Sequence, residues 1–284
     1  MPRWLRIVFT GLSFGMFFAG SMAFGLLFAP FLLLLSLGNR RMVRDFCTRF
    51  VGWGYGTFLL WMKLTGLIGY TRVPFPKELE GKAYVLVANH PTLIDVLFLL
   101  HWFPGLTSVA KAAAYRSIIL GPLLRSTHYL PGAGMKGDDE PTDSHMPRAL
   151  ERMVAHLEAG YPLVVFPEGT RSKATHLNRF RRGAFEAAVR AEVPLVRVFI
   201  RCDPLTLMKG RPFWDVPKSR AMYRFERLPI IDPRVDGRSG AELHRDVYTD
   251  FKERFEEWQR GQEKSPAALP SPVPEERAVE GSPT

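Results

Sequence analysis

The sequence has 284 residues, of which 46% are hydrophobic, and this is enough for one α/β domain with additional segments. Its formal net charge is +10, which favours an acidic partner: nucleic acid, anionic lipid or an acidic protein. With only Cys47 and Cys202, the composition excludes a disulfide framework and a cysteine-based metal cluster, and it predicts two unpaired thiols in a reducing compartment.

The N-terminal segment is strongly apolar. From Ile7 to Gly38 there is no Asp, Glu, Lys or Arg, and this run exceeds the ~20 residues that cross a bilayer core. It is also longer than the apolar region of a cleaved signal peptide, which has ~7–15 residues. We therefore expect an uncleaved membrane anchor. This makes lipid the favoured partner for the positive charge, and the sequence contains neither an RNA-binding motif nor zinc-ligand spacing, so we expect no nucleic acid and no metal.

Basic residues flank the anchor on both sides, namely Arg3, Arg6, Arg40, Arg41 and Arg44. The positive-inside rule then puts both flanks in the cytoplasm. A re-entrant helical hairpin satisfies that rule better than a single span, and the sequence leaves both open. Pro30 is expected to end the first helix, and the Gly11–Gly15 pair to permit a close helix contact.

Residues 51–70 are again apolar and aromatic, with Lys63 as the one charge. Trp53 and Trp61 suit the headgroup depth of a membrane. A core helix beneath a sheet fits the same pattern equally well. Both interpretations assign residues 1–70 to a hydrophobic, membrane-anchoring helical region.

Residues 71–260 have the pattern of an α/β domain. Short apolar runs predict buried strands at 84–88, 107–111, 162–166, 194–200 and 221–225. Helical patterns lie between them and after them, including one that begins near Gly183. The alternation predicts a mixed, largely parallel sheet flanked by helices. Residues 261–284 are rich in proline, small and charged residues, and we expect a disordered tail.

A histidine follows the first predicted strand directly, in the sequence Asn-His-Pro-Thr-Leu-Ile-Asp. His90 would lie at a sheet edge, where α/β proteins place their sites. Asp95 comes within about one helical turn, so its carboxylate can fix the imidazole tautomer and leave the other nitrogen as a general base. The alternative is a structural or capping pair, and the spacing alone leaves both open.

A second polar sequence, Pro-Glu-Gly-Thr-Arg-Ser, follows the strand at 162–166. Gly169 permits close approach of the backbone to a ligand, and Arg171 offers a planar fork of donors that suits a phosphate monoester. Thr170 adds a hydroxyl donor. A solvated basic loop is the alternative, but the two sequences together combine a base with a phosphate-binding loop.

These two sequences, in this order, resemble the motifs of the glycerolipid acyltransferases, whose best-known members are the 1-acylglycerol-3-phosphate acyltransferases. The resemblance covers roughly residues 50–230. It implies that His90 is the base and Asp95 its partner, and that the acceptor headgroup contacts Glu168, Gly169, Thr170 and Arg171. It also implies substrate contacts at Lys111 and Pro194, and an acyl thioester of CoA or acyl carrier protein as donor, with no cofactor.

The sequence departs from the family pattern at two places. The segment 111–132 ends in Tyr-Leu-Pro-Gly rather than in a basic sequence, and Arg125 and Lys136 are possible substitutes. After Pro194 the family often has a second proline, and this chain has Arg197. These departures bear on the acceptor rather than on the reaction.

The resemblance therefore predicts an O-acyltransferase of phospholipid biosynthesis that acylates a lysophospholipid, with 1-acylglycerol-3-phosphate as the expected acceptor, on the cytoplasmic face of the cell inner membrane. One alternative is acylation of another lysolipid or a lipid-like secondary metabolite. Another is a membrane-binding protein without activity, which intact His90 and Asp95 disfavour. A lipid hydrolase is disfavoured because we expect no Gly-x-Ser-x-Gly nucleophile elbow in this sequence.

Overall fold

A computed structural model describes residues 1–132 and 147–263 of the chain. Lys136 and almost all of the predicted tail, 261–284, lie outside the described residues. Residues on both sides of the predicted boundary between regions 1–70 and 71–260 contribute to one hydrophobic core. The division into these two regions therefore stays a prediction.

The described residues form a seven-stranded sheet with the order β1–β7–β6–β2–β5–β3–β4. The strands are β1 (Ile68–Tyr70), β2 (Val85–Ala88), β3 (Thr107–Ala110), β4 (Leu130–Pro131), β5 (Leu163–Val165), β6 (Leu195–Asp203) and β7 (Ala221–Ile231). Each pairing is parallel except that of β6 with β7. The predicted mixed, largely parallel sheet is confirmed.

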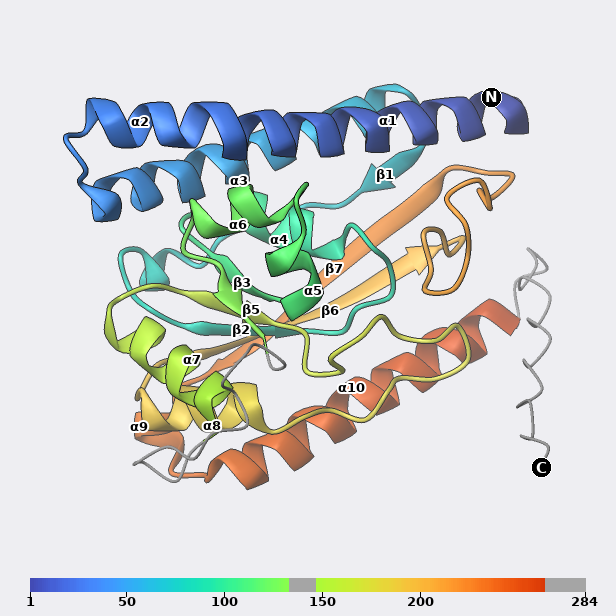
Figure 1. Ribbon diagram of the computed structural model, residues 1–284. Helices are drawn as coiled ribbons and strands as arrows, with labels where there is room; N and C mark the ends of the chain where they lie inside the picture. The colour runs from blue at the N-terminus through green and yellow to red at the C-terminus, as the bar shows by residue number, and fades with distance from the viewer. Residues whose placement is uncertain (133–146, 264–284) are drawn as a thin grey trace, which may run out of the picture.

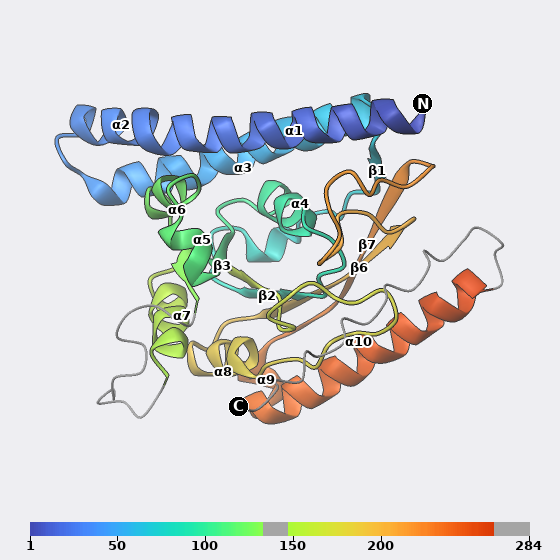
Figure 2. The same ribbon diagram turned by 45° about the vertical axis from the view of Figure 1, so that its right-hand side comes forward.

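Helices cover both faces of the sheet (Figures 1 and 2). One face packs against α3 (Arg40–Leu64), α4 (Asp95–Trp102), α5 (Ala112–Arg116) and α6 (Gly121–Arg125). The other is covered by α7 (Arg148–Glu158), α8 (Gly183–Arg190) and α10 (Gly240–Glu263), with the short α9 (Pro233–Asp236) beside α8. Successive residues of β2 show the two faces, because Leu86 belongs to the first core and Val87 to the second.

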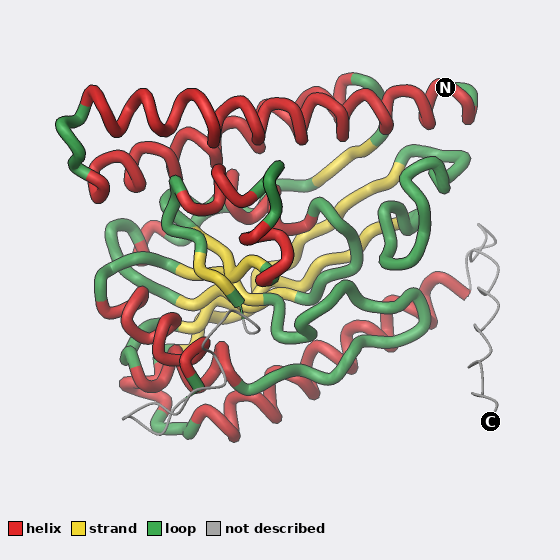
Figure 3. The backbone as a smooth tube through the Cα atoms, viewed as in Figure 1, coloured by secondary structure: helices red, strands yellow, loops and turns green. Residues whose placement is uncertain are grey.

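The N-terminal segment is a helical hairpin above the sheet. Helix α1 (Arg3–Ala23) continues through a π-helical turn (Phe24–Phe28) into α2 (Ala29–Leu35), and α3 runs back beneath it (Figure 3). The prediction that Pro30 ends the first helix was wrong. In the π turn, Ala29 N donates to Phe24 O, five residues back, and this wider turn accommodates the proline ring. The reversal comes later, where Leu37 and Gly38 have positive φ angles of 53° and 81°.

The buried residues of helix α1 are polar, whereas many of its apolar residues are exposed. Its buried residues are Arg6, Thr10, Ser13 and Ser21. The Trp61 indole of α3 donates to the Ser13 hydroxyl at 3.1 Å, whereas apolar residues on the outer face, such as Trp4 at 64%, are exposed. Residues Arg3–Leu35 are long and apolar enough to cross a bilayer. An outward apolar face of this length is typical of a helix in contact with lipid.

Helix α3 combines both interpretations of the segment at 51–70. Tyr55, Leu59 and Met62 are buried in the core between the hairpin and the sheet. On the opposite side, Trp53 and Leu64 are 63% and 76% exposed. The two predicted environments therefore lie on opposite faces of one helix.

Gly25 allows a close approach between the first arm of the hairpin and α6. A Cβ atom on Gly25 would lie 2.4 Å from the backbone nitrogen of Leu123 and 2.7 Å from the backbone carbon of Pro122 in α6. The expected close helix contact at Gly15 is not found, because nothing lies within 4 Å of a Cβ atom there, and Gly11 instead faces Phe213. The close approach is made by Gly25.

We expect Gly25→Ala to destabilise the protein by about 1–3 kcal/mol, because the methyl group meets backbone atoms that must shift. Gly20→Ala, in the same helix, is the matched control, since nothing lies within 4 Å of its Cβ position. That control should be neutral or slightly stabilising, because alanine favours helix over glycine. Chemical denaturation of both variants in detergent measures the difference, and equal stabilities would show that the hairpin adjusts freely over α6.

Candidate active site

The carboxyl ends of β2 and β5 bring the two polar sequences together. These strands are parallel neighbours, with Val87 opposite Val165. The loops that begin at Asn89 and Phe166 therefore leave the same edge of the sheet side by side. Asn89 fixes the first loop to the next strand, since its side chain donates to Ile200 O at 2.8 Å and accepts from Ile200 N at 2.7 Å.

His90 and Asp95 form the predicted pair. The Nδ1 atom of His90 lies 3.0 Å from Asp95 Oδ2. The Asp95 carboxylate is fully buried at the first residue of α4, whereas the His90 side chain is 18% exposed. The imidazole also stacks on Phe166, with ring centroids 4.1 Å apart. A carboxylate at Nδ1 fixes the tautomer in which Nε2 can accept a proton.

A chain of hydrogen bonds holds Asp95 in turn. Thr92 donates its backbone N–H to Oδ2 and its hydroxyl to Oδ1, both at 2.6 Å. The hydroxyl of Tyr223 on β7 donates to the Thr92 hydroxyl at 3.1 Å. Tyr223 is completely buried, and burial raises its pKa well above the usual value, so it stays a neutral donor. Sequence reasoning missed Tyr223, because it lies 131 residues from Thr92.

Glu168 joins the two loops. Its Oε1 accepts from the backbone N–H of His90 at 3.0 Å and from the Ser172 hydroxyl at 2.6 Å. Its Oε2 accepts two hydrogen bonds from Asn178, at 3.0 and 2.8 Å. Burial raises the pKa of Glu168, and these hydrogen bonds oppose the shift. The predicted contact with the acceptor headgroup is not supported by this geometry, since the buried carboxylate is occupied by protein donors.

The other residues of the second motif lie at the same edge of the sheet as His90. Gly169 has φ 68°, a conformation that favours glycine, and a Cβ atom there would lie 3.0 Å from Arg181 Nε. Arg171 donates from one terminal nitrogen to Leu207 O at 2.8 Å. Burial lowers the pKa of Arg171, and the Asp95 carboxylate opposes the shift. The Thr170 hydroxyl is buried and has no hydrogen-bond partner among the described residues.

The two remaining predicted site residues, Lys111 and Pro194, lie at opposite edges of the sheet. Lys111 is exposed and follows β3, so it lies at the same sheet edge as His90, two strands away. Pro194 precedes β6, and its carbonyl accepts from Val85 N at the start of β2. It therefore lies at the opposite edge of the sheet from His90, and a contact with substrate there is not supported. Pro194 begins the predicted strand 194–200, so its assignment to substrate came from the family resemblance and not from its place in the sheet.

Two further polar features lie away from this edge. His128 pairs with Asp45 at 2.8 Å, and His156 bonds to Thr107 at 2.8 Å. These partners, 83 and 49 residues distant, were not visible in the sequence. A Gly-x-Ser-x-Gly pattern also occurs at Gly11–Gly15, but Ser13 is inside α1 and donates to Phe9 O. It is not a nucleophile elbow, which needs a strand followed by a sharp turn.

Part of the chain is similar to a known protein family. The family model described as Acyltransferase matches residues 71–201, which include both motifs.

Several similar proteins are named as acyltransferases. A 1-acyl-sn-glycerol-3-phosphate acyltransferase of Saccharomyces cerevisiae is 33% identical over 44% of this chain and 40% of its own length. One from Chlamydomonas reinhardtii is 28% identical over 68% of this chain and 54% of its own. A third from Cocos nucifera is 23% identical over 73% of this chain and 64% of its own. The chain thus spans less than two thirds of the length of these relatives.

A solved structure has the same fold. The 1-acyl-sn-glycerophosphate acyltransferase PlsC from Thermotoga maritima superposes with a TM-score of 0.64 and 22% sequence identity, covering 90% of this chain and 98% of that one. The sheet with its flanking helices is therefore a known arrangement.

We expect Glu168→Gln to lower stability by about 2 kcal/mol or more. The amide of glutamine presents N–H donors to a site where four donors converge, so at least one buried donor loses its partner. The control is Glu158→Gln, which changes an exposed carboxylate at the end of α7 and should be within about 0.5 kcal/mol of the parent. Equal effects in chemical denaturation would mean that Glu168 does not hold the loops together.

Proposed function

We propose that the protein transfers a fatty acyl group from an acyl thioester to the free hydroxyl of a lysophospholipid, with 1-acylglycerol-3-phosphate as acceptor, and the match of residues 71–201 to the Acyltransferase family model supports this. The observation that carries the proposal is the His90–Asp95 pair, which lies beside Arg171 at one sheet edge. The family and the named relatives support it.

The chemistry requires one base and no covalent enzyme intermediate. His90 Nε2 takes the proton of the acceptor hydroxyl as the oxygen attacks the thioester carbonyl. The carbon–sulfur bond then breaks, and the imidazolium returns the proton to the departing thiolate, so that the donor leaves as a free thiol. Asp95 stabilises the imidazolium that forms, since its carboxylate lies 3.0 Å from Nδ1. Phe166 limits rotation of the ring by stacking on it.

Arg171 is the residue that we assign to the acceptor phosphate. One of its terminal nitrogens is held by Leu207 O, which fixes the direction of the guanidinium. Its remaining N–H groups supply donors for a phosphate monoester in a planar arrangement. Lys111 lies at the same edge and can add positive charge for an acidic donor or acceptor. Whether the thioester is carried by CoA or by acyl carrier protein is decided by testing both.

The membrane position follows from the hairpin. Its outer face is apolar, and basic residues stand at both ends of the long helix. We propose that it lies in the cytoplasmic leaflet of the inner membrane, where the acceptor lipid and a soluble donor both have access to the site.

His90→Ala should lower the rate of acyl transfer by about 10²–10⁴, the usual effect of removing a general base, with no loss of folding. The control His176→Ala changes an exposed histidine and should keep the parental rate. The assay uses purified protein, lysophosphatidic acid, and acyl-CoA or acyl carrier protein donors, read by mass spectrometry. Unchanged turnover in His90→Ala would refute the mechanism.

Arg171→Lys tests the acceptor. Lysine keeps the charge but loses the planar fork, so kcat/KM for lysophosphatidic acid should fall about tenfold or more, while a lysolipid without a phosphate monoester is affected much less. Arg245→Lys, an exposed position on α10, is the control. Equal losses on both acceptors would make Arg171 structural. High parental activity on the second lysolipid alone would favour a different acceptor.

A further inference from the structure

The loop between β6 and β7, residues 204–220, connects the active site to the membrane hairpin. At its start, the carbonyl of Leu207 accepts hydrogen bonds from Arg171 at 2.8 Å and from the backbone N–H of Leu93 at 3.2 Å. Leu93 follows His90 in the first motif, and Arg171 belongs to the second. Both active-site loops are therefore bonded to one carbonyl of this loop.

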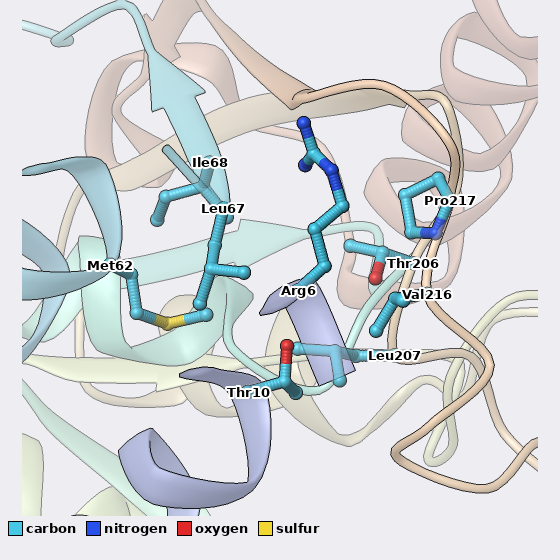
Figure 4. Close-up of a pocket in the computed structure, with 9 residues that line it drawn as sticks. All are labelled: Arg6, Thr10, Met62, Leu67, Ile68, Thr206, Leu207, Val216 and Pro217. Atoms are coloured by element: carbon cyan, nitrogen blue, oxygen red, sulfur yellow. The ribbon is translucent and has the colours of Figure 1, made fainter. Parts of the chain in front are cut away.

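Further along, the same loop packs against α1. Figure 4 shows Leu207, Val216 and Pro217 facing Arg6 and Thr10 of the anchor helix. Together these residues line a small cavity of about 10 Å³ between the loop and the helix. In Figures 1 and 2 the loop rises from the sheet to the N-terminal end of α1.

The tip of the loop carries two aromatic side chains that the fold leaves exposed. Phe213 and Trp214 are 45% and 54% exposed, and their rings contact each other edge to face at 5.0 Å. Phe213 lies against Gly11, where a Cβ atom would be 3.3 Å from its ring. Gly11 is next to the exposed apolar residues Val8 and Leu12, so the aromatic pair extends the outward apolar face of α1.

Positive charge flanks this aromatic pair. Lys209 and Lys218 lie four residues before Phe213 and four residues after Trp214, and both are exposed. Exposed aromatic side chains between lysines are typical of the headgroup region of a bilayer, where the rings meet the acyl boundary and the ammonium groups meet anionic lipid.

We propose that Phe213 and Trp214 insert into the headgroup region of an anionic bilayer, as a membrane contact separate from the helical hairpin. Because the Leu207 carbonyl bonds to both active-site loops, this contact holds those loops at the membrane surface. The proposal rests on membrane association of the protein and is independent of acyl transfer, so the loss of one does not entail the loss of the other.

Quenching of tryptophan fluorescence by brominated lipid tests the proposal. The full chain is added to vesicles of phosphatidylglycerol and phosphatidylcholine whose acyl chains carry bromine near the headgroups. The chain has six tryptophans, so the contribution of Trp214 is the difference between the parent and Trp214→Phe. We expect that contribution to lose at least about half of its emission and to become inaccessible to aqueous iodide.

Trp258→Phe is the matched control. Trp258 packs against Phe255 on α10, across the sheet from the hairpin, so its contribution should not be quenched by brominated lipid. The proposal is overturned if the Trp214 contribution stays accessible to iodide and unquenched by bromine while the protein is bound to the vesicles.

The lysines are tested by Lys209→Gln combined with Lys218→Gln. In anionic vesicles at low salt, this variant should show less quenching of the Trp214 contribution than the parent, whereas in phosphatidylcholine alone the two should agree. Identical quenching of the parent and this variant in anionic vesicles would overturn the proposed role of anionic lipid. The insertion of Phe213 and Trp214 is decided separately, by the quenching of the Trp214 contribution. Neither readout uses enzymatic activity.

Discussion

The geometry of the site depends on one buried carboxylate, that of Glu168. It accepts the backbone N–H of His90 from one loop and the groups of Ser172 and Asn178 from the other. Parallel neighbouring strands bring the two loops to the same sheet edge, but the strands alone leave each loop free to move. Because the carboxylate is buried, loss of any of these bonds leaves a polar group without water, and this cost keeps the base in one position.

Much of the fold and of the catalytic pair could be predicted from the sequence. Fully buried parallel strands are continuous apolar runs, and the run ending at Ala88 leads directly to His90. The spacing from His90 to Asp95 is local, so the pairing at 3.0 Å follows from a single turn of chain. The family resemblance added the reaction, which the pair by itself did not determine.

What could not be predicted depends on contacts between distant residues. Nothing near Tyr223 in the sequence indicates that its hydroxyl supports Thr92. Nor does the sequence show that four protein donors converge on the Glu168 carboxylate. Pro194 was assigned to substrate although its strand carries it to the other sheet edge. Pro30 was expected to end a helix, because the sequence does not reveal that the preceding turn widens by one residue. In each case tertiary geometry decided the role, and residue type did not.

The contacts of the loop between β6 and β7 also bear on which acceptor the proposed reaction would use. Arg171 is held by Leu207, and Leu207 belongs to the loop that packs on the anchor helix. A guanidinium fixed in this way points in a direction set by the loop, and the loop is seated on α1, whose outer face is apolar. If Arg171 binds the acceptor phosphate and α1 lies in the membrane, as we propose, that phosphate is recognised at a fixed position relative to the lipid surface. A lysophospholipid fits this constraint, because its phosphate lies at the headgroup level and its acyl chain stays in the bilayer, whereas a soluble phosphate ester would gain nothing from the hairpin.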